Sequence, residues 1–413
     1  MMENVNLPIR ADLAGLEPYG APQLDLPVRL NVNEFPYPPP LAVVESILKA
    51  VAEAARDLNR YPDRDFDELR AALANYLNNE SHLKGAAALK PENIWAANGS
   101  NEVMQHLFQA FGGPGRTALT FAPTYSMYPE YARDTFTNWH TIARNSDFSI
   151  DLPSAISAIK ELAPSIIILC SPNNPTGTAL TLKEIATILN AANSIIVPGT
   201  ETEQSAGAHP IVIVDEAYGE FRRQGTPSAL ELLPQHPNLA VSRTMSKAFG
   251  AAGLRLGYLA ASPELINALR IVRLPYHLSA ITQASAIAAL GHAAEMQAQV
   301  AEIRDRRDAL AHWLSQQTGQ PSEAQHPSFE EAHSAVSKPR HISIVTTPSD
   351  ANFVMFGRFT DRHRVWQQLT DDGVLIREVG PPGWLRVTVG SESETEAFKK
   401  SLTKILETAQ LLG

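Results

Sequence analysis

The stretch VSRTMSKAFGAAGLRLGY, residues 241–258, runs from an apolar strand into a hydroxyl-rich turn that holds Lys247. Thr244 and Ser246 flank this lysine, and Arg255 follows after two glycines, which allow close backbone approach. Hydroxyl groups together with a guanidinium are typical of a phosphate site. A lysine beside such a site can form a Schiff base if its surroundings favour the neutral amine. A solvated lysine in an ordinary strand-turn segment is the alternative.

Short apolar runs alternate with helical patterns on both sides of this stretch. Helices are predicted over residues 181–192 and 263–272. The runs that predict strands are residues 117–121, 165–170, 211–214, 239–242 and 257–261. This βαβ rhythm predicts an α/β fold with a mostly parallel central sheet flanked by helices. Ligands of such sheets bind beyond the carboxyl ends of the strands.

Polar residues follow two of the predicted strands directly. Asp215 ends the run IVIVD and is followed by Tyr218, so its carboxylate lies where it can hold a ring nitrogen protonated. A helix cap or a metal ligand is an equally good use of such an acid. Asn174 lies in residues 171–177, SPNNPTG, whose prolines and glycine fix a rigid turn. A turn without further function is the alternative for this segment.

Two further segments carry candidate ligand contacts. Gly99, Ser100 and Asn101 open an apolar periodic helix, and a helix N-terminus offers free N–H groups to a phosphate. Simple helix capping would use the same residues. Tyr125 follows the strand at 117–121 and can stack on a planar ring or pack in the core.

The ends of the chain predict a second, smaller domain. The proline-rich residues 36–40 cannot form a helix, residues 41–57 read as an amphipathic helix, and residues 279–314 read as one long helix or two abutting ones. Residues 317–340 are polar and contain three prolines, which predicts a surface insertion. We expect a large domain over 42–285, and a small α+β domain made of 1–41 and 286–413.

The composition limits the partners. The 413 residues contain 34 Lys and Arg against 44 Asp and Glu, a formal net charge of −10. Nucleic acids and anionic membranes need a concentrated basic surface, so neither is an expected partner. No apolar stretch is long enough for a membrane span or a signal peptide, and no metal site is expected. Cys170, the only cysteine, ends an apolar run and is expected to be buried. These features indicate a soluble cytoplasmic protein.

The ordered motifs resemble the class I and II pyridoxal-phosphate-dependent aminotransferases of fold type I, and histidinol-phosphate aminotransferases most of all. The segments that carry the resemblance are LNVNE 30–34, RYPD 60–63, NGSNE 98–102, PTY 123–125, SPNNPTG 171–177, VDEAY 214–218, SK 246–247 with Arg255, LPY 274–276 and LRVTVG 385–390. The resemblance covers nearly the whole chain. It departs from the family pattern at Phe35, where Asn is usual, and at Asn101, where Asp is usual.

The resemblance implies pyridoxal 5'-phosphate as cofactor and a role for each motif. Lys247 would bind the cofactor covalently and move the proton at the substrate Cα, and Asp215 would keep the ring nitrogen protonated. Tyr218 and Asn174 would hydrogen-bond the ring oxygen, and Tyr125 would stack on the ring. The residues implied to hold the phosphate are Gly99, Ser100, Asn101, Thr244, Ser246 and Arg255, with Tyr61 from a second subunit.

The substrates follow from the same resemblance. Arg386 would bind the carboxylate of 2-oxoglutarate or glutamate, and Arg377 and Arg386 are the candidates for the phosphate of histidinol phosphate, together with Tyr276 of a partner chain. A homodimer is therefore expected. An aromatic amino-acid aminotransferase, a phosphothreonine-type decarboxylase and a binding protein that has lost catalysis are the alternatives; the retained Lys247, Asp215 and Arg255 argue against the last.

Overall fold

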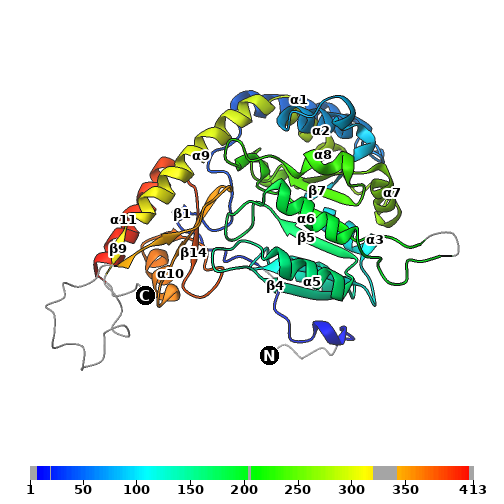
Figure 1. The fold of residues 1–413 in the computed structure, drawn as a ribbon. Coiled ribbons are helices and arrows are strands. Elements are labelled where there is room, and N and C mark those ends of the chain that lie inside the picture. The colour runs from blue at the N-terminus through cyan, green and yellow to red at the C-terminus, as the bar shows by residue number, and fades with distance from the viewer. Residues whose placement is uncertain (1–6, 19, 203–205, 320–341, 409–413) are drawn as a thin grey trace.

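A seven-stranded sheet forms the centre of the molecule in the computed structural model, which describes residues 7–18, 20–202, 206–319 and 342–408 (Figure 1). The strand order is β2-β8-β7-β6-β5-β3-β4. The strands are β2 (Ile94–Asn98), β3 (Thr117–Ala122), β4 (Asn138–Ala143), β5 (Ile166–Cys170), β6 (Ile211–Asp215), β7 (Leu239–Thr244) and β8 (Leu256–Ala261). Only β8 runs antiparallel to its neighbours, which confirms the predicted α/β class with a mostly parallel sheet.

Helices pack around this sheet. In Figure 1, α5 and α6 lie in front of it and α1, α2 and α8 gather along its upper edge. Their bounds are α1 (Leu41–Ala54), α2 (Asp67–Glu80), α3 (Gly99–Phe111), α4 (Tyr128–Asp134), α5 (Leu152–Leu162), α6 (Leu182–Ala192), α7 (Pro263–Val272), α8 (Ala280–Leu290) and α9 (Ala293–Ser315). The predicted helical stretch at 279–314 is thus two abutting helices. Among the described residues, no helix combines the length and apolarity needed to cross a membrane.

The C-terminal part forms a separate small sheet with its own helices. Helix α9 runs from the large sheet to this part (Figure 1). Strands β11 (Val345–Thr346), β12 (Phe353–Gly357) and β14 (Leu385–Thr388) pair antiparallel, and α10 (Arg362–Asp371) and α11 (Glu392–Thr408) accompany them. Strand β1 (Val28–Arg29) pairs parallel with β13 (Val374–Leu375), so this part of the N-terminal segment lies against the C-terminal part. The predicted domain boundaries, 42–285 against 1–41 and 286–413, stay a prediction.

Most of the predicted insertion at 317–340 lies outside the described residues. Thr318–Gly319 within it form β9, which pairs with β10 (Ile342–Ser343) in a separate two-stranded sheet, so regular structure begins inside the segment read as an insertion. Two strands of the large sheet were not predicted. Strand β4 lies at the sheet edge and has only exposed and half-buried residues, and β2 was read only as the approach to a helix.

Candidate active site

The carboxyl ends of β5, β6 and β7 meet at a cavity of about 330 Å³, the size expected of a small-ligand site. Twelve of the predicted site residues line this cavity: Ser100, Asn101, Tyr125, Asn174, Asp215, Tyr218, Thr244, Ser246, Lys247, Arg255, Arg377 and Arg386. Because the strands are parallel, their ends reach the same sheet edge, and the motifs that follow them are brought together.

Lys247 follows β7 and reaches across the cavity. Its Nζ donates a hydrogen bond to the carbonyl oxygen of Val32 at 3.0 Å. Burial, and to a smaller extent the charge of Arg386, lower the pKa of Lys247 to about 8, whereas the charge of Glu34 acts in the opposite direction. A substantial fraction of the amine is therefore neutral and nucleophilic near neutral pH.

Asp215 is the last residue of β6 and is 5% exposed. Its Oδ2 accepts a hydrogen bond from the hydroxyl of Tyr128 at 2.7 Å, and its Oδ1 accepts one from the backbone N–H of Ala217 at 3.2 Å. Burial raises the pKa of Asp215 to about 6, against the lowering effect of these two donors. The side chain is thus an anion at neutral pH that a positively charged ligand would stabilise.

A chain of hydrogen bonds connects the two halves of the cavity wall. Arg386 on β14 donates from Nη1 to Oδ1 of Asn174 at 2.5 Å and from Nη2 to the carbonyl of Asn31 at 2.7 Å. The Tyr218 hydroxyl accepts from Nδ2 of Asn174 at 3.4 Å and from Nδ2 of Asn33 at 2.9 Å. The C-terminal part thereby contributes a buried guanidinium directly beside the residues that follow β5 and β6.

The start of α3 forms the opposite end of the cavity. Gly99 has φ +81° and faces Arg255, so closely that a Cβ there would lie 2.6 Å from the guanidinium. A Cβ on Gly257 would lie 2.1 Å from the backbone nitrogen of Ser100. The Thr244 hydroxyl donates to Ser246 Oγ at 3.0 Å. Two glycines thus let β8 and a guanidinium approach the helix start, a geometry suited to an anion.

Tyr61 and Tyr276 lie apart from this cavity. Tyr61 is 79% exposed and Tyr276 is 41% exposed, and their rings stack on each other with centroids 4.6 Å apart. Neither lines the cavity of its own chain, so the expectation that both serve a partner subunit stays a prediction. Arg377 does line the cavity, because it pairs backbone to backbone with Arg386 in both directions.

Comparison with known proteins decides the family. The family model for class I and II aminotransferases matches residues 27–402. The chain belongs to this aminotransferase family. A histidinol-phosphate aminotransferase of Bifidobacterium longum (strain NCC 2705) is 52% identical to this aminotransferase over 404 residues, which are 97% of each protein.

Solved structures confirm the fold. Histidinol-phosphate aminotransferase from Sinorhizobium meliloti, in complex with pyridoxal-5'-phosphate, matches 98% of each chain with a TM-score of 0.75 at 21% identity. L-threonine-O-3-phosphate decarboxylase from Porphyromonas gingivalis matches 91% of this aminotransferase and 98% of its own chain, with a TM-score of 0.66 at 18% identity. The fold alone therefore does not separate transamination from decarboxylation.

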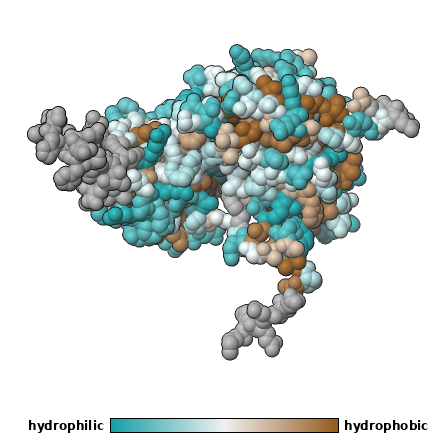
Figure 2. Space-filling model, turned by 60° about the horizontal axis from the view of Figure 1, so that its bottom comes forward, coloured by the Kyte–Doolittle hydropathy of each residue, from teal (hydrophilic) through white to brown (hydrophobic). Residues whose placement is uncertain are grey.

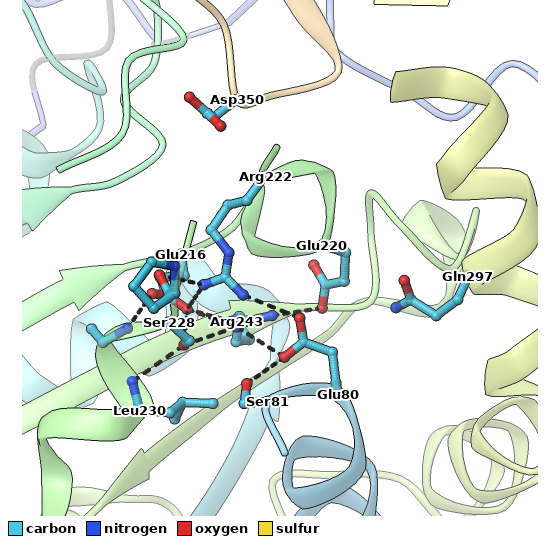
Figure 3. Close-up of polar contacts among 12 residues, drawn as sticks. Glu80, Ser81, Glu216, Glu220, Arg222, Ser228, Leu230, Arg243, Gln297 and Asp350 are labelled. Carbon is cyan, nitrogen blue, oxygen red and sulfur yellow. Dashed lines mark hydrogen bonds and ion pairs between the residues drawn. The ribbon is translucent and has the colours of Figure 1, made fainter. Parts of the chain in front are cut away.

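Behind the cavity, this aminotransferase holds a buried group of charges, here named the ionic cluster (Figure 3). Its members are Glu80, Glu216, Glu220, Arg222 and Arg243. The fully buried Arg243 binds Glu216 at 2.7 Å and Glu220 at 3.1 Å. Burial lowers the pKa of Arg243, but Glu80, Glu216 and Glu220 together raise it well above its ordinary value.

The ionic cluster joins the loop after β6 to the end of β7. A Cβ on Gly219 would lie 2.6 Å from Cζ of Arg243, so the loop passes directly over the guanidinium. Arg222 reaches both Glu80 and Glu216, at 3.1 and 3.2 Å. The backbone N–H of Arg223 donates to Asp350, which precedes β12, at 2.8 Å. The loop that follows Asp215 and carries Tyr218 is therefore tied to β7 and to the C-terminal part.

Sequence reasoning missed several residues that shape the site. Asn33 contacts Tyr218, yet the segment LNVNE carried only a resemblance and no role; its two asparagines, 31 and 33, were the available signal. Tyr128 and the ionic cluster gave no sequence signal, because their contacts join distant segments. Cys170 is buried as expected, and burial raises the pKa of its thiol to about 12.

Proposed function

We propose that this aminotransferase catalyses pyridoxal-phosphate-dependent transamination of L-histidinol phosphate with 2-oxoglutarate, giving imidazole acetol phosphate and L-glutamate in histidine biosynthesis. The observation that carries the proposal is one cavity that unites Lys247, Asp215, an anion-binding helix start and Arg386, in a chain 52% identical to a histidinol-phosphate aminotransferase. The S. meliloti relative of the same name is solved with pyridoxal-5'-phosphate.

The residues present fit that cofactor. Its phosphate suits the start of α3, where Gly99 and Gly257 leave room only for backbone and where Ser100, Asn101, Thr244, Ser246 and Arg255 gather. Its basic ring nitrogen suits Asp215, a desolvated carboxylate whose pKa is raised to about 6 and which gains from a positive partner. Its ring oxygen suits the hydroxyl and amide donors of Tyr218 and Asn174, and Tyr125 offers a ring face.

The chain's own residues then divide the work. When bound, pyridoxal phosphate supplies a ring that accepts the electron pair released as the substrate Cα loses its proton. Lys247 would take that proton from the substrate Cα and return it to the cofactor carbon on the other side of the substrate nitrogen, since its lowered pKa allows both states near neutral pH. Asp215 keeps its negative charge and holds the ring nitrogen protonated.

Two of the three arginines that line the cavity, Arg377 and Arg386, account for the substrate pair. Histidinol phosphate has a phosphate and no α-carboxylate, whereas glutamate and 2-oxoglutarate carry carboxylates. A guanidinium binds both groups through paired N–H donors. Arg386, held by Asn174 and Asn31, and Arg377 beside it are the groups we assign to these anions.

A homodimer and a cytoplasmic location complete the proposal. Ile271 and Leu274 are 83% and 76% exposed beside the stacked Tyr61 and Tyr276. Figure 2 shows apolar residues gathered on the half of the molecule that holds the large sheet, while the half with the C-terminal part is mostly hydrophilic on the face displayed. Exposed aromatic and aliphatic side chains of this kind favour burial against a second copy. The free, buried Cys170 suits a reducing compartment.

Single-turnover amino transfer tests the substrate. The purified enzyme with bound pyridoxal phosphate is mixed with histidinol phosphate or with phenylalanine, and the change in cofactor absorbance is followed. We expect a clear preference for histidinol phosphate. A preference for phenylalanine would indicate an aromatic aminotransferase instead. Release of carbon dioxide from phosphothreonine, with no amino acceptor present, would indicate the decarboxylase.

A further inference from the structure

Tyr128 lies directly behind the Asp215 carboxylate, outside the wall of the cavity. It begins α4, and its ring is fully buried. Its hydroxyl donates to Oδ2 of Asp215 at 2.7 Å, and its ring meets that of Tyr125 edge to face with centroids 5.5 Å apart. Tyr125 lines the cavity and Tyr128 does not. Tyr128 therefore reaches the site through its hydroxyl at Asp215 and through its ring at Tyr125, and only the first contact depends on the hydroxyl.

The surroundings of Asp215 make this hydrogen bond consequential. Tyr128 faces it from α4, Cys170 faces it from β5, and Glu216, Ala217 and Tyr218 follow it on its own loop. Burial raises the pKa values of the Tyr128 hydroxyl, the Cys170 thiol and the Tyr218 hydroxyl, so all three are neutral at neutral pH. Glu216 opposes the charge on Asp215. Stabilisation of the carboxylate thus comes from two donors, Tyr128 and the Ala217 N–H.

We propose that Tyr128 is a positioning residue that keeps Asp215 an oriented carboxylate and so keeps the cofactor ring nitrogen protonated. The inference rests on the proposed function. A neutral carboxylic acid at this position would present its own proton to the ring nitrogen and lose the charge that favours a protonated ring. Removing one of two donors from a carboxylate that is 5% exposed shifts the balance toward that neutral acid.

The test is Tyr128→Phe, with Tyr131→Phe as matched control. Tyr131 lies on the same helix, is 5% exposed, and packs against Phe108 with ring centroids 6.0 Å apart. Dissociation of pyridoxal phosphate from the apoprotein is measured by equilibrium dialysis from pH 5.5 to 9. We expect Tyr128→Phe to weaken binding roughly tenfold near pH 6.5, the value of one hydrogen bond to a charged group. The difference in cofactor affinity between the wild type and Tyr128→Phe should become smaller as the pH rises, because Asp215 then ionises in the variant as well.

The pH dependence separates positioning from a structural role. The acid limb of kcat/KM should move to higher pH in Tyr128→Phe and stay in place in Tyr131→Phe. In an Asp215→Asn background, Tyr128→Phe should change cofactor affinity much less than in the wild type, because the group it acts on is gone. Equal losses in both backgrounds, or a loss of affinity that is the same at every pH, would overturn the inference. Failure of the wild-type protein to bind pyridoxal phosphate or to use histidinol phosphate would instead overturn the proposed function.

Discussion

The two sides of the strand ends β6 and β7 are equally buried and electrostatically opposite. Asp215 and Thr244 face the cavity, while their chain neighbours Glu216 and Arg243 face the ionic cluster, as expected where successive residues of a strand alternate. In the cavity, burial raises the pKa of Asp215 to about 6 and lowers that of Lys247 to about 8. In the ionic cluster, three carboxylates raise the pKa of the equally buried Arg243.

The difference shows what pairing does to a buried charge. The charges of the ionic cluster are paired with one another, and these ion pairs tie the loop after β6 to β7. Asp215 and Lys247 form no ion pair within the described residues, and burial moves the pKa of each toward neutral pH. These two groups of the cavity can therefore keep shifted pKa values, because the ionic cluster, one residue away along β6 and β7, holds the backbone that carries them.

Removal of the cavity lysine should have the largest effect on turnover. We expect Lys247→Ala to lower kcat by roughly 10⁴-fold or more, because the group that moves the proton is lost. Its stability should change by less than about 1 kcal/mol, since the buried charge was unfavourable. Lys183→Ala, at an exposed position on α6, is the control for both measurements. Unchanged turnover in Lys247→Ala would contradict the assigned role.

Removing the central arginine of the ionic cluster should lower the stability of the protein. Arg243→Met leaves Glu216 and Glu220 buried without their main partner, and we expect urea unfolding of the apoprotein to show a loss of about 3–5 kcal/mol. The control is Arg133→Met, which removes a partly exposed pair with Glu130 and should cost about 1 kcal/mol or less. Similar losses in the two variants would show that the ionic cluster does not brace the strand ends.

Asp215→Asn should have opposite effects on stability and on binding: we expect it to stabilise the apoprotein and to weaken cofactor binding. The folded-state pKa of about 6 lies above the ordinary 3.8, so the folded state binds more protons in between and stability falls as the pH rises from about 4 to 6. Above pH 6, ionisation of Asp215 lowers the free energy of unfolding by up to about 3 kcal/mol. Asp215→Asn should recover only part of this free energy, because the asparagine oxygen accepts from one of the two donors and its amide group cannot accept from the other. Thermal unfolding of the apoproteins should show a higher Tm for the variant at pH 7.5 and no advantage at pH 4. A lower Tm at pH 7.5 would contradict the unfavourable charge.

The contrast also explains how much the sequence could predict. The cavity residues were found because Lys247, Asp215 and Asn174 each follow an apolar run, and parallel strands bring such positions to one edge. The contact of Tyr128 with Asp215 joins residues 87 apart, and that of Glu80 with Arg243 joins residues 163 apart. A tyrosine or glutamate in a helical pattern does not indicate which distant residue it contacts. Strand β4 was missed because an edge strand with polar residues lacks the apolar run of a central one.

The smallest expected effect concerns the pH at which the apoprotein captures its cofactor. With a pKa of about 8, about a tenth of Lys247 is neutral at pH 7 and half at pH 8. The rate of cofactor capture, followed by stopped-flow absorbance, should therefore rise about fivefold from pH 7 to 8 and level off near pH 9. An ordinary lysine would give a rate that still rises tenfold per pH unit at pH 9.

Two neutral substitutions should move that midpoint in opposite directions. Burial is the main cause of the lowered pKa of Lys247, and the charges of Arg386 and Glu34 modify it with opposite signs. Arg386→Gln removes a neighbouring cation, which stabilises the protonated form of Lys247 and moves the midpoint to higher pH. Glu34→Gln removes an anion and moves it to lower pH. Shifts in the same direction would mean that the substitutions act through the shape of the cavity. The charges of Arg386 and Glu34 would then not set the reactivity of Lys247.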